Sequence, residues 1–93
     1  EKGARASVKP FDIEFRPRAK KFLKGLDKRS QERIYAAIEI LRFDPIPKSA
    51  LRLTSSTNYR IRVGDYRIIY SFNGGNLVVC IISIGHRRDV YRK

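Results

Sequence analysis

The chain is short of several residue types, and each shortage excludes a class of protein. Its 93 residues include one cysteine, Cys80, and neither tryptophan nor methionine. A single cysteine excludes a disulfide within the chain, which fits a reducing cytoplasm. The sequence has no apolar run of about 18 residues, so it predicts no transmembrane helix. Because Cys80 lies in a shorter apolar run, we expect its thiol to be a small buried hydrophobe rather than a catalytic group.

Acidic side chains are also scarce. Nine Asp and Glu residues oppose 21 Lys and Arg, which gives a formal net charge of +12 and a pI near 10.5. Such an excess favours a polyanionic partner: RNA, DNA, an anionic membrane surface or an acidic protein. The alternative is that the charge only keeps the protein in solution. Net charge alone does not distinguish these interpretations, so we next consider where the basic residues lie in the sequence.

The chain is long enough for one domain with a single core. Residues 1–9 have no apolar signal segment and are expected to form a flexible leader, followed by one domain over residues 10–93. From Phe11 to Phe15 apolar residues alternate with acids, a pattern typical of a half-buried strand. The domain is therefore expected to begin with a strand.

Two helices are predicted next. Pro17 suits the first position of a helix, and the apolar residues that follow it recur at helical spacing. Asp27 is a suitable N-cap for a second helix from about Lys28 to Phe43. The Asp44-Pro45 pair should end that helix, because a proline ring disfavours helical geometry at the residue before it.

The most informative stretch is NYRIRVGDYRIIY, residues 58–70. It predicts strands over 59–63 and 66–70, joined by Gly64-Asp65 in a type II′ turn. This loop places Arg62 opposite Arg67 and leaves one face apolar, while Arg60, Arg62 and Arg67 share the other. Two arginines opposite each other repel, which a sheet tolerates where an anion such as phosphate belongs.

The last predicted strand runs from Leu77 to Ile84, and its continuous apolar run indicates a central place in the sheet. Pairing across Gly74-Gly75 would put Phe72 opposite Leu77 and Arg67 opposite Ile82, unless a β-bulge shifts the register. The arginine face would then be a cleft with an apolar floor formed by Val78, Cys80, Ile82 and Ile84. His86 would lie on that face too. We therefore expect an α+β fold: an N-terminal strand and a two-helix hairpin packed on a three- to four-stranded antiparallel sheet.

The tail, GHRRDVY, adds residue types suited to RNA cleavage. Arginine can hold two phosphate oxygens and keeps its charge, histidine transfers protons near neutral pH, and tyrosine can donate a hydrogen bond or stack on a base. No set of acids is spaced like a magnesium site, so we expect no metal and no other cofactor. Each residue also has a plain structural alternative: a solvated strand face, a basic tail, an inert histidine, or a tyrosine that caps the core.

Two segments, YRIRVGDYRIIY and ISIGHRRDVY, resemble the RelE/ParE superfamily of toxin–antitoxin toxins, and its RelE branch in particular. The resemblance implies a microbial RNase-like fold and ribosome-dependent cleavage of mRNA in the A site. It also implies a RelB-like antitoxin as partner. The motifs carry family roles over to Arg60 and Arg62 on the strands and to Arg67, Arg87 and Tyr91. The catalytic candidates are Arg67, Arg87 and Tyr91, together with His86 from the tail. The candidates for RNA or phosphate binding are Arg60, Arg62, Arg88, Lys48 and Arg52.

One departure concerns the general base, because the best-studied branch has lysines where Arg60 and Arg62 stand. A lysine can lose its proton in a protein, whereas an arginine practically cannot. Proton transfer would then fall to His86 or Tyr91. Two other functions stay open: a ParE-like toxin that poisons gyrase without catalysis, and a basic RNA-binding module.

Overall fold

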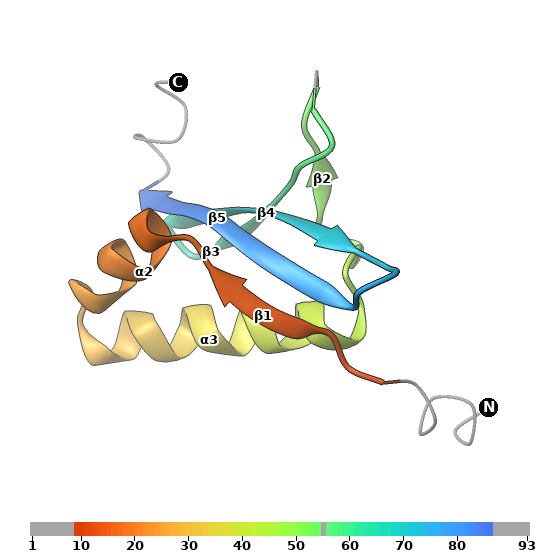
Figure 1. Ribbon diagram of the computed structural model, residues 1–93. Coiled ribbons are helices and arrows are strands. Elements are labelled where there is room, and N and C mark those ends of the chain that lie inside the picture. The colour runs from red at the N-terminus through yellow and green to blue at the C-terminus, as the bar shows by residue number, and fades with distance from the viewer. Residues whose placement is uncertain (1–8, 55, 87–93) are drawn as a thin grey trace.

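The computed structural model describes residues 9–54 and 56–86 of the chain (Figure 1). Within them, two helices and five strands follow one another in the order β1, α2, α3, β2, β3, β4 and β5. Their bounds are β1 Asp12–Phe15, α2 Pro17–Lys24, α3 Lys28–Phe43, β2 Leu51–Arg52, β3 Tyr59–Val63, β4 Tyr66–Asn73 and β5 Val78–His86. The predicted order of elements is confirmed.

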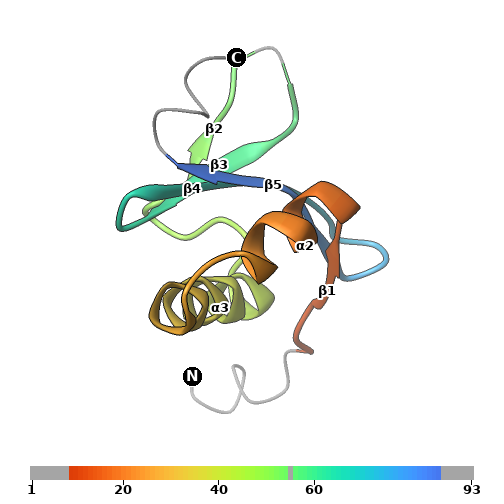
Figure 2. The same ribbon diagram turned by 90° about the vertical axis from the view of Figure 1, so that its left-hand side faces the viewer.

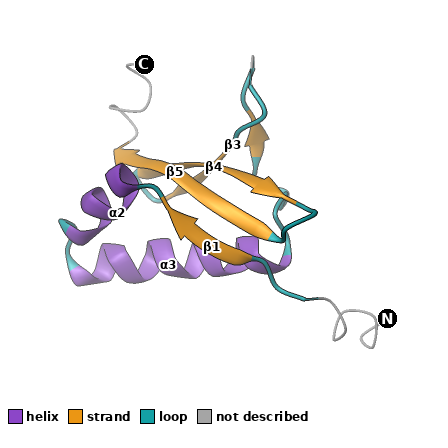
Figure 3. Ribbon diagram, in the orientation of Figure 1, coloured by secondary structure: helices purple, strands orange, loops and turns teal. Residues whose placement is uncertain are grey.

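The strands form one sheet in the order β1-β5-β4-β3-β2 (Figure 3). Neighbouring strands are antiparallel, except that β1 runs parallel to β5. The α+β class is confirmed. Strands β2 to β5 form the expected antiparallel sheet, with the two-residue strand β2 as its fourth member, and β1 adds a fifth, parallel strand at the edge. Strand β5 consequently lies inside the sheet, as its apolar sequence predicted.

The helix boundaries follow from local chemistry. Pro17 begins α2, where its missing N–H is not needed by the helix. The Asp27 carboxylate caps α3 by accepting hydrogen bonds from the Ser30 backbone N–H at 3.1 Å and from the Ser30 hydroxyl at 2.8 Å. These bonds hold the pKa of Asp27 below its usual value, with the side-chain bond contributing most. The helix ends before Asp44, as the following proline predicted.

Both helices pack against the same face of the sheet (Figure 2). The apolar face predicted for the hairpin is the face they cover, and Ile61, Ile68 and Tyr70 are buried there. Side chains of both helices and the neighbouring strand complete the core: Ala19, Leu23, Ile34, Ile38, Leu41, Val79, Ile81 and Ile84. The opposite face is covered by neither helix in the part of the chain that the structure describes, and we call it the open face (Figure 2).

The register of β3 and β4 agrees with the prediction at every pair, including Arg62 opposite Arg67. The predicted register of β4 and β5 is wrong. The turn is longer than Gly74-Gly75 and includes Leu77, whose φ is 57°. Phe72 therefore lies opposite Val79 instead of Leu77.

A β-bulge then shifts the register by one more residue. Ile69 pairs with Ser83 whereas Tyr70 pairs with Ile81, which leaves Ile82 as the extra residue. Arg67 therefore lies opposite Gly85 instead of Ile82. When one extra residue is inserted, the side chains on one side of the insertion point to the opposite face from the one that unbroken alternation predicts. Val78 and Cys80 consequently stay on the open face as predicted, but Ile84 and His86 face the helices.

Tyr70 of β4 contacts the loop that follows α3. Its hydroxyl donates a hydrogen bond to the Pro45 carbonyl at 2.6 Å, and the side chain is fully buried. Burial raises the pKa of Tyr70 to about 12, with smaller contributions from Tyr59 and Asp44. An unfolded chain would ionise this phenol near pH 10.

This difference predicts a loss of stability at alkaline pH. Below pH 10 the phenol is protonated in both states, so its contribution is fully present; between about pH 10 and 12 only the unfolded state releases the proton, and stability falls. The free energy of unfolding should drop by about 2 kcal/mol across this window. Urea unfolding at pH 9.5 and pH 11.5 measures the drop, and Tyr70→Phe should reduce it. An equal drop in both proteins would contradict the assignment.

Candidate nucleic-acid interface

Three predicted arginines lie on the open face. Alternation along β3 and β4 places Arg60, Arg62 and Arg67 on the side away from the core, with Arg62 directly opposite Arg67 and Arg60 opposite Ile69. We call these three residues the arginine cluster. They differ in exposure: Arg62 is exposed, Arg60 is half-buried and Arg67 is only 4% exposed.

The cluster concentrates positive charge on a surface partly withdrawn from water. The Nε atom of Arg60 and the Nε and Nη1 atoms of Arg67 are shielded from solvent. Charges interact more strongly where the effective dielectric constant is low, so the interactions of these guanidinium groups are stronger than those of a fully exposed arginine. The like charges of Arg62 and Arg67 destabilise the strand pair, and a bound anion would relieve that repulsion.

Apolar side chains border the cluster. Ile69 lies next to Arg60 on β4, and Leu51 lies opposite Arg60 on β2 with 51% of its surface exposed. The expected combination of basic and apolar groups is therefore present on the open face. Its apolar part differs from the prediction, since Ile84 faces the helices.

The turn between β3 and β4 is held in place from the helix layer. Gly64 has a φ of 60°, and no other described residue of the turn has a positive φ, which fits the predicted type II′ geometry. A Cβ added at Gly64 would lie 3.4 Å from the Arg33 guanidinium of α3. Arg33 thus packs on the turn that joins Arg62 to Arg67, a contact that no pattern in the sequence indicated.

His86 lies away from the arginine cluster, and its predicted position is wrong. It pairs with Tyr66, and the two rings meet edge to face at 5.8 Å between centroids. Tyr66 in turn contacts Phe22 of α2 at 6.1 Å, so this group of rings belongs to the helix side of the sheet. The bulge at Ile82 is the physical reason, because it exchanges the faces of the strand before His86 is reached.

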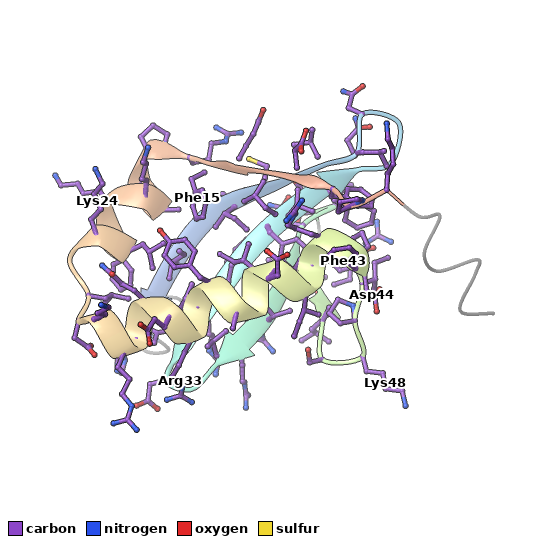
Figure 4. The ribbon with its side chains drawn as sticks, turned by 90° about the horizontal axis from the view of Figure 1, so that it is seen from below. Phe15, Lys24, Arg33, Phe43, Asp44 and Lys48 are labelled. Atoms are coloured by element: carbon purple, nitrogen blue, oxygen red, sulfur yellow. The ribbon has the colours of Figure 1, made fainter. Side chains whose placement is uncertain are left out.

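The other candidates are spread along the chain. Arg52 is exposed and lines a hollow of about 590 Å³ in the loop between β2 and β3, together with Leu53, Thr54, Ser56 and Thr57. Lys48 is exposed on the connection after α3 and points away from the sheet when the molecule is viewed from the helix side (Figure 4). Arg87, Arg88 and Tyr91 lie outside the described residues.

A second feature of the open face lies toward the turn between β4 and β5. It is a hollow of about 390 Å³ lined by Glu14, Thr57, Ser71, Phe72, Asn73, Asn76, Val78 and Cys80. Cys80 is half-buried and lines this hollow, whereas the sequence suggested a buried thiol. Sequence reasoning missed the hollow because it depends on the pairing of β1 with β5, which brings Glu14 next to Cys80.

Two further observations concern metals and membranes. Among residues 9–54 and 56–86, no three His, Cys, Asp or Glu side chains are grouped as metal ligands would be. Neither described helix is long and apolar enough to span a bilayer. The open face thus carries guanidinium groups toward one end and the polar hollow toward the turn between β4 and β5.

Comparison with known proteins identifies the family. The family model described as "ParE toxin of type II toxin-antitoxin system, parDE" matches residues 13–91. The chain is 31% identical to RelE1 of Methanocaldococcus jannaschii over 86 residues, covering 88% of this chain and 96% of that protein. It is 27% identical to toxin RelG of Mycobacterium tuberculosis over 90 residues, covering 90% and 99% of the two chains.

Solved structures give the same result. RelE in the RelE–RelB complex from Pyrococcus horikoshii superposes with a TM-score of 0.72 at 30% identity, over 84% of this chain and 96% of that one. A free mutant of RelE from E. coli superposes with a TM-score of 0.73 at 25% identity, over 89% and 92%. Sequence and fold together show that the chain belongs to the RelE/ParE superfamily of type II toxin–antitoxin toxins, in its RelE-like branch.

Proposed function

We propose that this protein is a ribosome-dependent mRNA endonuclease that stops translation by cutting mRNA in the ribosomal A site. The observation that carries the proposal is the arginine cluster, where Arg62 and Arg67 stand opposite each other with Arg60 on the same face. Guanidinium groups match the oxygens of a phosphate in shape and charge, and three of them on one face give an RNA backbone a binding surface. They would also stabilise the negative charge that builds up on the phosphate during cleavage.

The reaction would proceed by attack of the ribose 2′-hydroxyl on the adjacent phosphorus. The O2′–P bond forms, the P–O5′ bond breaks, and the 5′-oxygen leaves with a proton. Arg67 and Arg62 would hold the phosphate oxygens and stabilise the added negative charge, while Arg60 would orient the neighbouring backbone. Arg87 would add a further cation, and Arg88, Arg52 and Lys48 would bind RNA outside the reacting phosphate. This chemistry requires no metal ion.

The reaction also needs a group that accepts the proton of the 2′-hydroxyl and one that donates a proton to the 5′-oxygen. Neither Arg60 nor Arg62 can act as a general base, because a guanidinium group keeps its proton at any physiological pH. His86 contacts Tyr66 on the helix side of the sheet, away from the cluster, which leaves Tyr91 as the other candidate for proton transfer. Substituting His86 and Tyr91 one at a time in a cleavage assay identifies which of them transfers it.

The partners would be the ribosome with its mRNA, and an antitoxin of the RelB type. RelE of Pyrococcus horikoshii has been solved in complex with RelB, at 30% identity to this chain. An antitoxin with acidic segments would cover the open face and neutralise part of the net charge of +12. With these partners, the protein would act in the cytoplasm.

A cell-free translation system tests the proposal. Added protein should stop synthesis, and mapping of the transcript ends should show cuts within codons that occupy the A site. Cleavage should continue in excess EDTA once the mRNA-bound ribosomes are fixed by a brief crosslink, because the reaction uses no metal ion. Intact transcripts together with continued synthesis would refute the endonuclease.

One alternative has an observation in its favour, namely that the matching family model is that of ParE. A ParE-like toxin would bind DNA gyrase and damage DNA while leaving mRNA whole. Expression in bacteria separates the two functions, since a DNA-damage response with intact mRNA identifies the gyrase poison. Harmless expression without any antitoxin would instead identify a basic RNA-binding module.

A further inference from the structure

The hollow at the far end of the open face differs chemically from the arginine cluster. Six of its lining residues carry polar groups, namely Glu14, Thr57, Ser71, Asn73, Asn76 and Cys80, and the other two, Phe72 and Val78, are apolar. Glu14, Cys80 and Ser71 lie side by side in register across β1, β5 and β4. The same open face thus carries guanidinium groups toward one end and neutral hydrogen-bonding groups with one carboxylate toward the other.

The carboxylate decides what this hollow can bind. A phosphate would be repelled by Glu14, so an RNA strand on this face cannot place its backbone there. A nucleobase carries no charge and offers hydrogen-bond donors along its edge. A carboxylate accepts hydrogen bonds from the exocyclic amino groups of cytosine, adenine or guanine, whereas uracil offers only its ring N3–H, flanked by two carbonyl oxygens that repel the carboxylate.

Size and distance also suit a base. The volume of about 390 Å³ is within the range of small ligand sites, about 300–1,000 Å³. Arg67 and Ser71 are four residues apart on β4, which corresponds to about 13 Å along the strand. A dinucleotide can span that distance with a phosphate at the arginines and a base in the hollow.

The turn beside the hollow is already ordered for such a contact. The Asn73 Oδ1 atom accepts hydrogen bonds from the backbone N–H groups of Gly75 and Asn76, each at 2.8 Å. These bonds fix the Asn73 side chain and do not use its two amide donors. Asn73 and Glu14 line the same hollow, so together they can supply a donor and an acceptor to the edge of a base.

We propose that this hollow, which we call the base subsite, binds a nucleobase carrying an exocyclic amino group, with Glu14 as the residue that selects against uracil. The inference rests on the proposed function, because it gives the mRNA substrate a second contact point on the same face. In this arrangement the RNA backbone binds at the arginine cluster, and one of its bases binds near the turn between β4 and β5.

Alkylation of the thiol tests the base subsite directly. Cys80 is the only cysteine of the chain and lines the hollow, so a base bound there should shield it from iodoacetamide. Short 2′-O-methyl oligonucleotides are suitable probes, because they lack the hydroxyl that attacks in the proposed reaction. Cytidine and adenosine oligomers should slow alkylation at concentrations about tenfold lower than uridine oligomers do.

Two variants make the test specific. Glu14→Gln should abolish most of the difference between cytidine and uridine oligomers. Glu32→Gln removes the same charge from an exposed position on α3, on the other side of the sheet, and should leave the difference unchanged. Equal protection by cytidine and uridine, protection by neither, or an unaltered preference in Glu14→Gln would overturn the proposal.

The outcome is separable from that of the proposed function. If cytidine oligomers protect Cys80 selectively but the protein leaves ribosome-bound mRNA whole, the base subsite is supported and the endonuclease is refuted. Cleavage of mRNA by a protein whose Cys80 is never protected would support the endonuclease and refute the base subsite.

Discussion

Replacing Arg67 with glutamine is expected to lower the rate of mRNA cleavage by a factor of about 30 to 1,000. This corresponds to about 2–4 kcal/mol of transition-state stabilisation, the range found when one donor to a developing negative charge is removed. Arg67 should cause the largest loss in the cluster, because it is the most deeply buried of the three arginines. Single-turnover cleavage of ribosome-bound mRNA measures the effect.

Two controls separate chemistry from folding. The thermal unfolding of Arg67→Gln shows whether a folded protein is being assayed, which matters for a side chain only 4% exposed. Arg29→Gln removes the same charge from an exposed position on α3 and should change the rate less than threefold. A well-folded Arg67→Gln protein that cleaves as fast as the Arg29→Gln control would remove Arg67 from the mechanism.

Replacing Arg62 with glutamate should separate stability from activity. The change converts a repulsive pair across β3 and β4 into an attractive one, so unfolding should require about 0.5–1 kcal/mol more. The same change places a negative charge where the phosphate would bind, and cleavage should fall at least 100-fold, about 3 kcal/mol. A variant that is more stable and inactive would identify the repulsion as a cost that the protein bears for its function.

Urea unfolding and single-turnover cleavage measure the two effects on the same sample. Arg62→Gln is the matched intermediate, because it removes the repulsion without adding an attraction. Stability should increase in the order wild type, Arg62→Gln, Arg62→Glu. A loss of stability in both variants would show that Arg62 makes favourable contacts in the folded protein, and would contradict the view that the Arg62–Arg67 pair is destabilising.

Local patterns were sufficient for the hairpin and for the helices. The two-residue loop at Gly64-Asp65 determines the register of β3 and β4, so Arg62 could be placed opposite Arg67 from sequence. The N-cap at Asp27 and the proline after Asp44 likewise set the limits of α3. In each case the deciding interaction lies within a few residues along the chain.

The remaining features depend on contacts that are distant in sequence. The bulge at Ile82 could not be predicted, because the residues around it form an uninterrupted apolar run. It is the reason that His86 faces the helices. The parallel pairing of β1 with β5 joins segments separated by both helices, and without it the hollow beside Glu14 cannot be foreseen. Periodicity gives the face of a strand only while the register is unbroken.

The central claim is that the arginine cluster binds the RNA backbone, and the salt dependence of binding tests it most directly. For a single strand, the plot of log K against log salt concentration has a slope of about −0.7 for each phosphate neutralised. With a 2′-O-methyl oligonucleotide, Arg62→Gln should make the slope less steep by about 0.7, and Arg29→Gln should leave it unchanged. Equal slopes for wild type and Arg62→Gln would mean that RNA binds elsewhere, and the account of the open face would be wrong.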